Sequence, residues 1–188
     1  MLRATSIGAM LVLASSALAT TAAPVQRVSP DFQISEPGKQ TVHLASFRGK
    51  VVVLEFLFIQ SQHCLRVVQT LNKLHDQLGS RGFQPVGIVF DPPNVRISSD
   101  QLIGPVEASF KLTFPLGYAT KGAVDEYLER TASETLNIPQ VVVIDRAGRI
   151  RATSGGRGGN PALETEDSLR GLIDTLLKES TETDSNSR

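Results

Sequence analysis

The sequence predicts one α/β domain in which a mixed sheet lies between layers of helices. Two nearly continuous apolar and β-branched runs, Val51 to Phe58 and Phe83 to Phe90, have the pattern of strands that are covered on both faces. Apolar residues recur between them with helical spacing. Strand, helix and strand in this order predict a parallel crossover unit at the centre of the sheet.

Composition agrees with a globular protein of one domain. The chain has 188 residues, of which 40% are hydrophobic and 20% are charged, enough to build one core. Nineteen basic side chains balance nineteen acidic ones, so no basic excess is available to bind the phosphates of a nucleic acid. One cysteine and three histidines exclude an internal disulfide scaffold and disfavour a four-ligand zinc site.

The first 23 residues are expected to be a secretory signal peptide. Arg3 precedes an apolar run, Ile7 to Ala19, that is too short to span a bilayer, and small residues before Thr20 or before Pro24 provide a cleavage site. An uncleaved anchor is the alternative. Cleavage would leave a mature chain without a membrane span, periplasmic or secreted, in an oxidising compartment.

The crossover unit has recognisable boundaries. Thr41 to Leu44 alternates like a short exposed strand and predicts an N-terminal hairpin arm ahead of the first buried strand. The helix of the unit is expected over roughly residues 62 to 78, because its apolar stripe ends at Leu78 and Gly79 follows as a stop signal.

Beyond the crossover unit, the predicted elements are weak helices interrupted at Gly104-Pro105, a short apolar piece from Phe114 to Tyr118, a hairpin of Gln140 to Asp145 with Arg149 to Thr153, and a last helix entered through Asn160-Pro161. Residues 180 to 188 are polar and are expected to be a disordered tail. Because no repeat or internal linker interrupts this series, residues 24 to 179 are predicted to form a single domain.

The order of elements and two motifs carry a resemblance to a known superfamily. The motifs are S-F-R-G-K-V-V-V-L-E-F and I-P-Q-V-V-V-I-D-R-A-G-R-I, and the similarity covers roughly residues 30 to 178. With these features the chain resembles the thioredoxin-like redoxins, which include the TlpA-type disulfide reductases and the AhpC/TSA peroxiredoxins. The resemblance implies a thioredoxin-like three-layer sandwich, with helices on both faces of the sheet and thiol chemistry at the start of the first helix.

The C-x-x-C motif of that family is incomplete in this chain. The matching residues are Ser61-Gln62-His63-Cys64, so a serine occupies the position of the nucleophilic first cysteine. An unactivated serine hydroxyl cannot replace a thiolate in attacking a disulfide. Ser61 is instead expected to act as an N-cap that accepts a hydrogen bond from the backbone N–H of Cys64.

Cys64, in the resolving position, has two interpretations. It extends the apolar stripe of the helix toward its start, where a buried thiol would be inert and have a raised pKa. The positive end of the helix dipole and the neighbouring His63 would instead favour the thiolate. The sequence leaves both interpretations open.

Glu55 and Pro139 complete the candidate site. Glu55 interrupts a buried apolar run, where an unpaired carboxylate is costly. The resemblance implies that Glu55 matches a buried acid that assists proton transfer at the second cysteine; the alternative is a partly solvated strand residue bonded to a loop. By the same resemblance, Ile138-Pro139 matches the cis-proline that shapes the substrate groove of the family.

Two further features are weaker candidates. Cys64 and His75 are eleven residues apart, which is about 16 Å along a helix, so this helix alone cannot build a metal site. The glycine-rich run Ser154 to Gly159 could bind an anion but is expected to be a connecting loop. We expect no metal and no cofactor.

Three functions remain. The expected one is an exported thiol-disulfide oxidoreductase, or a monothiol descendant, in which Cys64 forms mixed disulfides with a protein thiol or disulfide. A peroxidase acting on a small peroxide is the second, since Ser61-x-x-Cys64 can be compared with the Thr-x-x-Cys of peroxiredoxins, although Leu57 stands where that family has proline. A redox-silent binding or chaperone module that uses the groove at Pro139 is the third.

Overall fold

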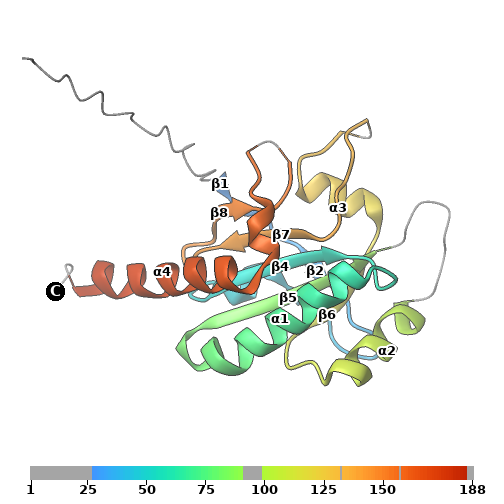
Figure 1. The fold of residues 1–188 in the computed structure, drawn as a ribbon, viewed down its shortest axis with the longest axis horizontal. Helices are drawn as coiled ribbons and strands as arrows, with labels where there is room; N and C mark the ends of the chain where they lie inside the picture. The colour runs from blue at the N-terminus through green and yellow to red at the C-terminus, as the bar shows by residue number, and fades with distance from the viewer. Residues whose placement is uncertain (1–26, 91–98, 132, 157, 186–188) are drawn as a thin grey trace, which may run out of the picture.

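The computed structural model describes residues 27–90, 99–131, 133–156 and 158–185. The expected signal peptide and its cleavage sites lie outside the described residues. Within the described ranges, no helix is both long enough and apolar enough to cross a membrane. These residues form the three-layer α/β sandwich that the sequence predicts (Figure 1).

A six-stranded mixed sheet forms the middle layer, in the order β1-β8-β7-β4-β5-β6. Its strands are β1 (Arg27–Val28), β4 (Val51–Leu57), β5 (Phe83–Phe90), β6 (Leu116–Ala119), β7 (Gln140–Ile144) and β8 (Arg149–Thr153). The pairs β4/β5 and β5/β6 are parallel, whereas β7 pairs with β4 and β8 with β7 in antiparallel fashion. The central place of β4 agrees with the burial of all its seven residues.

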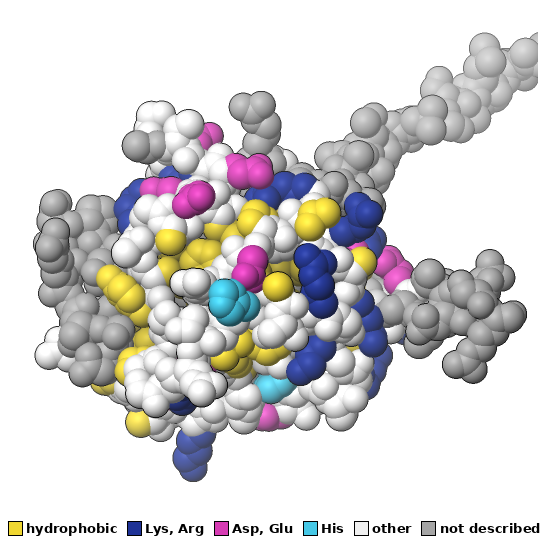
Figure 2. All heavy atoms as spheres, turned by 180° about the vertical axis from the view of Figure 1, so that it is seen from behind, with side chains coloured by type: hydrophobic (Ala, Val, Ile, Leu, Met, Phe, Trp, Pro, Cys, Tyr) yellow, Lys and Arg dark blue, Asp and Glu magenta, His cyan; other side chains and the backbone are white. Residues whose placement is uncertain are grey.

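Helices cover both faces of this sheet. The helices α1 (Gln62–Leu78), α2 (Ser99–Phe110) and α4 (Glu166–Ser185) contribute side chains to the core on one face, which we call the α1-side core. The helix α3 (Lys121–Tyr127) and the two-stranded arm of β2 (Gln33–Ile34) and β3 (Val42–His43) lie on the opposite face, where a second core, which we call the α3-side core, includes Leu54, Phe56 and Tyr127. Figure 2 shows the surface of the molecule from behind the view of Figure 1. Three short 3-10 helices complete the fold: η1 (Leu44–Phe47), η2 (Gly79–Arg81) and η3 (Pro161–Glu164).

The register of β4 decides where Glu55 points. Val53 and Leu57 belong to the α1-side core, whereas Leu54 and Phe56 belong to the α3-side core. Because successive side chains of a strand alternate between faces, Glu55 lies on the α1 side of the sheet. Its direct neighbours on the adjacent strands are Gly87 in β5 and Val141 in β7. Neither neighbour offers a polar side chain to the carboxyl.

The structure corrects two expectations about helices. The sequence Gly104-Pro105 does not interrupt α2, which runs continuously from Ser99 to Phe110. Ile103 and Val106 are buried in the α1-side core, and this packing outweighs the backbone hydrogen bond that proline removes. Of the tail expected to be disordered, residues 180 to 185 instead continue α4 to Ser185, since no glycine or proline stops the helix after Gly171, and residues 186 to 188 lie outside the described residues.

The remaining boundaries move by a few residues. The first helix and the second buried strand are confirmed as α1 and β5, and the apolar piece after α2 overlaps β6. The arm is shorter than expected, because Leu44 already begins η1. At the far end, Asn160 caps η3 rather than the last helix, which begins at Glu166. The short helix η3 brings Glu164 to His63 in the candidate site, and the sequence pattern did not single out Glu164.

Candidate functional site

Ser61 starts α1 as an N-cap, as predicted. Its backbone is extended, with φ −88° and ψ 112°, and its Oγ accepts a hydrogen bond of 3.3 Å from the backbone N–H of Cys64. Its carbonyl accepts the next helical bond, from the N–H of Leu65, at 3.0 Å. The serine hydroxyl at the position of the missing cysteine therefore satisfies a backbone donor of the first helical turn.

Cys64 is completely buried, with 0% of its surface exposed, and it belongs to the α1-side core together with Val67, Leu71 and Leu163. Burial raises the pKa of its thiol; hydrogen bonds with Ser61 and the backbone of Phe58 act in the opposite direction. The structure therefore favours the interpretation of Cys64 as a buried thiol over that of an exposed thiolate at a helix start.

Glu55 is also completely buried, which contradicts the alternative of a partly solvated strand residue. Neither of its carboxylate oxygens has a hydrogen-bond partner among the described residues. Burial, and second the charge of Glu164, raise the pKa of Glu55 well above its ordinary value. Since an ionised carboxylate without a partner is disfavoured in such a place, burial favours the neutral carboxylic acid relative to an exposed glutamate. Glu55 in turn contributes to the raised pKa of Cys64.

His63 and Glu164 form a contact across two elements. The His63 Nε2 lies 3.1 Å from Glu164 Oε2 and so links the first turn of α1 to η3. The His63 side chain is 46% exposed and that of Glu164 is 17% exposed. Asn160 fixes the start of η3, because its Oδ1 accepts a hydrogen bond of 3.1 Å from the N–H of Ala162. The sequence analysis missed Glu164; an acidic residue shortly after Asn160-Pro161 was the only available signal.

Pro139 follows a cis peptide bond after Ile138, as the resemblance implied. The buried Ser154 fixes the chain beside it: its Oγ accepts a hydrogen bond of 2.9 Å from the N–H of Val141 and donates one of 3.5 Å to the carbonyl of Pro139. Ile138 packs against both cores and therefore borders the same core as Cys64.

The glycine-rich run Ser154 to Gly159 also helps to hold the chain at Pro139 and the start of β7, through the hydrogen bonds of Ser154. Ser154 holds the start of β7, and next to it a Cβ at Gly155 would lie 2.5 Å from Gln140 Oε1, so any larger residue there would have to displace the Gln140 amide. The sequence analysis expected this run to be a connecting loop and missed the role of its first serine. A buried serine with two backbone partners has no signature in sequence pattern.

The candidate residues thus fall into one region. His63 and Cys64 lie in the first turn of α1, Ser61 is its N-cap, and Glu55 lies on the face of the sheet that α1 covers. No group of three metal-ligating side chains occurs within the described ranges. The chemistry available here is that of one thiol beside one buried carboxyl, with a histidine and a second carboxylate at the surface.

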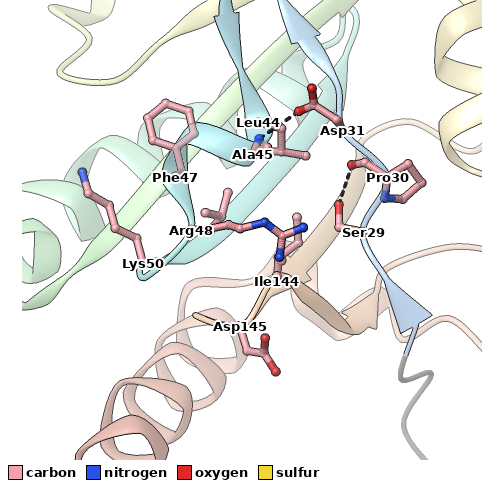
Figure 3. A pocket seen from close by; sticks show the side chains of 12 residues that line it. Ser29, Pro30, Asp31, Leu44, Ala45, Phe47, Arg48, Lys50, Ile144 and Asp145 are labelled. Carbon is pink, nitrogen blue, oxygen red and sulfur yellow. Dashed lines mark hydrogen bonds between the residues drawn. The ribbon is translucent and has the colours of Figure 1, made fainter.

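One pocket lies on the other face of the sheet (Figure 3). It is lined on the α3 side by Leu44, Arg48, Val52 and Ile144, among others. It leaves about 20 Å³ for solvent, which is room for a single water molecule. Because Arg48 spans this pocket in Figure 3, and because its residues come from the opposite face of the sheet, it is not the place where a partner would meet Cys64.

Comparison with known proteins agrees with the fold. The AhpC/TSA family profile matches residues 25–153. A thiol:disulfide interchange protein of the thioredoxin family from Chlorobium tepidum is similar in structure, with a TM-score of 0.64, 19% identity, and coverage of 84% of this chain and 99% of that one. For the thioredoxin domain of a thiol-disulfide oxidoreductase from Bacteroides vulgatus the values are 0.60, 18%, 81% and 99%. No curated protein sequence matches the chain.

Proposed function

Because the chain belongs to the AhpC/TSA family, we propose that it is an exported thioredoxin-like protein that exchanges thiols and disulfides through the single thiol of Cys64. One observation carries the proposal. The fully buried carboxyl of Glu55, which has no hydrogen-bond partner among the described residues, contributes to the raised pKa of the single thiol in the sequence. Such a group destabilises a fold, so a chemical role for it at Cys64 accounts for its presence. Protein thiols and disulfides are the proposed partners.

The proposed reaction is one half of the usual exchange. The Cys64 sulfur attacks one sulfur of a partner disulfide, the partner's S–S bond breaks, and a mixed disulfide with Cys64 forms. The proton of the Cys64 thiol passes by way of Glu55 to the departing thiolate. A second thiolate, from the same or another partner, later attacks the partner sulfur and releases Cys64, which takes a proton back. Ser61 cannot perform this second step within the chain, so the mixed disulfide persists until an external thiol arrives.

A second candidate is a redox-silent binding module that uses the surface around Ile138 and Pro139. Two observations favour it: Cys64 has no exposed surface, and the Ser61 hydroxyl is bonded to the backbone. A peroxidase has less support. Among the described groups that shift the pKa of Cys64 none is a cation, whereas a peroxide-reducing cysteine depends on a stabilised thiolate.

Trapping of a mixed disulfide tests the proposal. The folded protein is incubated with oxidised glutathione from about pH 6 to 9 and analysed by intact mass, with Cys64→Ser and the urea-unfolded chain as controls. We expect one glutathione on folded protein, absent from Cys64→Ser, at a rate that rises with pH. Reaction of the unfolded chain alone would support the binding module and contradict thiol exchange.

Export is tested separately by the mass of material recovered outside the cytoplasm. A mature chain that begins at Thr20 or Pro24 is expected, since both positions follow small residues at −1 and −3. A chain that retains residues 1 to 19 would contradict both cleavage and release into an oxidising compartment.

A further inference from the structure

One end of the central sheet carries a basic surface. At this end β4 and β5 begin and β7 turns back into β8, since Val51 pairs with Phe83 and Val52 with Ile144. Figure 2 shows Lys and Arg side chains gathered on the right, which corresponds to the left of Figure 1, the side toward which α4 extends. The two turns that meet at this end of the sheet carry four basic side chains, which we call the basic end: Arg48, Lys50, Arg146 and Arg149.

Hydrogen bonds between the two turns hold these side chains together. The N–H of Gly49 donates to the carbonyl of Arg146 at 2.9 Å, and Arg48 Nη1 donates to the carbonyl of Ala147 at 2.9 Å. The Arg146 guanidinium donates to the carbonyl of Gly49 at 3.5 Å and to that of Arg81 at 3.0 Å. Basic residues that lie about one hundred positions apart in the sequence therefore form one surface.

The basic end has no counter-charge of its own. Within the residues that the structure describes, none of its four side chains forms an ion pair with a carboxylate. Asp145, in the same turn, accepts from the backbone N–H of Arg149 and from the side chain of Arg151. Asp174 pairs with the neighbouring Arg81. An external anion can therefore bind these cations without displacing an internal partner.

The shape of the basic end favours an extended anionic surface over a small anion. The pocket beside Arg48 has room for a single water molecule only (Figure 3), whereas the side chains of Arg48, Lys50 and Arg149 are exposed. Next to them lies Val28, which pairs with Arg149 and has 57% of its surface exposed. Cations beside an exposed apolar side chain suit the headgroup layer of a membrane, where phosphates meet the first acyl carbons.

The sequence places the same end of the domain close to a membrane during export. Val28 follows the apolar run that ends at Ala19 by nine residues, and an extended chain of that length spans at most about 30 Å. Because Val28 pairs with Arg149, the basic end is the part of the sheet that this short connection reaches first.

We propose that the basic end binds the anionic headgroups of a phospholipid membrane, with Arg48, Lys50 and Arg149 contacting lipid phosphates and Val28 entering the headgroup layer. The candidate site lies at the other end of the sheet, since β4 runs for seven residues, about 20 Å, before the chain reaches α1. Protein bound in this way presents Cys64 and Pro139 away from the membrane. This binding goes beyond the proposed function and does not depend on thiol exchange.

Co-sedimentation with lipid vesicles tests the proposal. Protein recovered after export is mixed with vesicles of phosphatidylcholine alone or with about 30% phosphatidylglycerol added to supply anionic headgroups. Any binding to phosphatidylcholine alone, such as a retained apolar run would give, is subtracted. We expect binding that requires phosphatidylglycerol and that weakens between about 0.05 and 0.5 M salt, because salt screens exposed charges.

Charge-neutralising variants locate the contact. Lys50→Gln combined with Arg149→Gln should weaken binding to the anionic vesicles by roughly 20-fold, whereas Arg48 and Arg146 are left intact because they hold the two turns together. Arg66→Gln combined with Lys111→Gln is the matched control. It removes the same charge from exposed positions in α1 and after α2, and it should bind as the wild type does.

Absence of binding to the anionic vesicles, or an equal loss in the two double variants, would overturn the proposal. So would binding of heparin, a soluble polyanion, by protein that ignores the vesicles, which would indicate an acidic macromolecule as the partner. If the double variant at the basic end does not fold, Arg149→Gln alone must weaken vesicle binding by roughly fivefold. The series can be repeated in Cys64→Ser, so its outcome is separate from that of glutathione trapping.

Discussion

Glu55 places a carboxyl in a fully buried environment, which disfavours its ionised form. Its pKa is raised, first by burial and second by Glu164, so the native state binds a proton more tightly than the unfolded chain does. Stability from this group is fully present below the unfolded pKa near 4.3 and is lost as pH rises through the folded value. The wild-type protein should therefore become less stable from mildly acidic to alkaline pH through this one carboxyl.

Replacement of Glu55 by glutamine removes this pH dependence and keeps the shape of the side chain. We expect the stability of Glu55→Gln, measured as its free energy of unfolding minus that of the wild type, to be higher at about pH 8 than at about pH 4. Urea titrations at both pH values measure it. The exposed Glu126 offers a matched control, since Glu126→Gln should show no comparable change. A stability difference that does not depend on pH would show that Glu55 carries the same charge in both states.

At the scale of the element, α1 is capped by the hydroxyl oxygen of Ser61, at the position where the C-x-x-C motif has the sulfur of its first cysteine. The Ser61 hydroxyl accepts from the N–H of Cys64, and loss of such a cap costs about 1 kcal/mol. Ser61→Ala should lower the unfolding free energy by about that amount in urea. Thr120→Ala removes the equivalent cap of α3, whose hydroxyl accepts from Ala123, and should also destabilise the fold but leave Cys64 chemistry unchanged. If Ser61→Ala left the free energy of unfolding unchanged, the hydrogen bond of this cap would not contribute to stability.

Ser61→Cys converts the same position into the first cysteine of a C-x-x-C motif. A thiol at a helix N-terminus has a lowered pKa and is exposed to a partner, so this variant should reduce insulin disulfides with dithiothreitol as electron source. The wild-type protein should reduce insulin far more slowly, because its single thiol, Cys64, is buried and has a raised pKa. Rapid insulin reduction by wild type would show that Cys64 alone suffices and that position 61 is not the missing nucleophile.

At the scale of the whole molecule, local patterns were enough to predict most of the architecture. The buried runs of β4 and β5 and the apolar stripe of α1 fixed the central crossover, since their periodicity follows directly from burial. The continuity of α2 could not be predicted, because burial of Ile103 and Val106 outweighs the local signal of Pro105. Tertiary packing decided that element.

The site was predictable where it lies in one segment, or where, as at Ile138-Pro139, the family resemblance supplied the residue. One short stretch of sequence contains Ser61, His63 and Cys64. Glu55 could be recognised because it is a charged residue within an apolar strand. Glu164 reaches the site by the fold of η3, more than one hundred residues later in the sequence, so no local pattern could assign it. The burial of Cys64 was likewise undecided, since the apolar stripe and the helix dipole favour opposite states of the thiol.

The central claim is that Glu55 and Cys64 form one coupled pair of a buried acid and a buried thiol. The rate of Cys64 alkylation against pH, in wild type and Glu55→Gln, measures the coupling most directly. Glu55 contributes to the raised pKa of Cys64, so its neutral replacement should lower the apparent pKa of the thiol, while Glu126→Gln should not. Identical alkylation profiles in wild type and Glu55→Gln would contradict the pair and remove the main support for thiol exchange at this site.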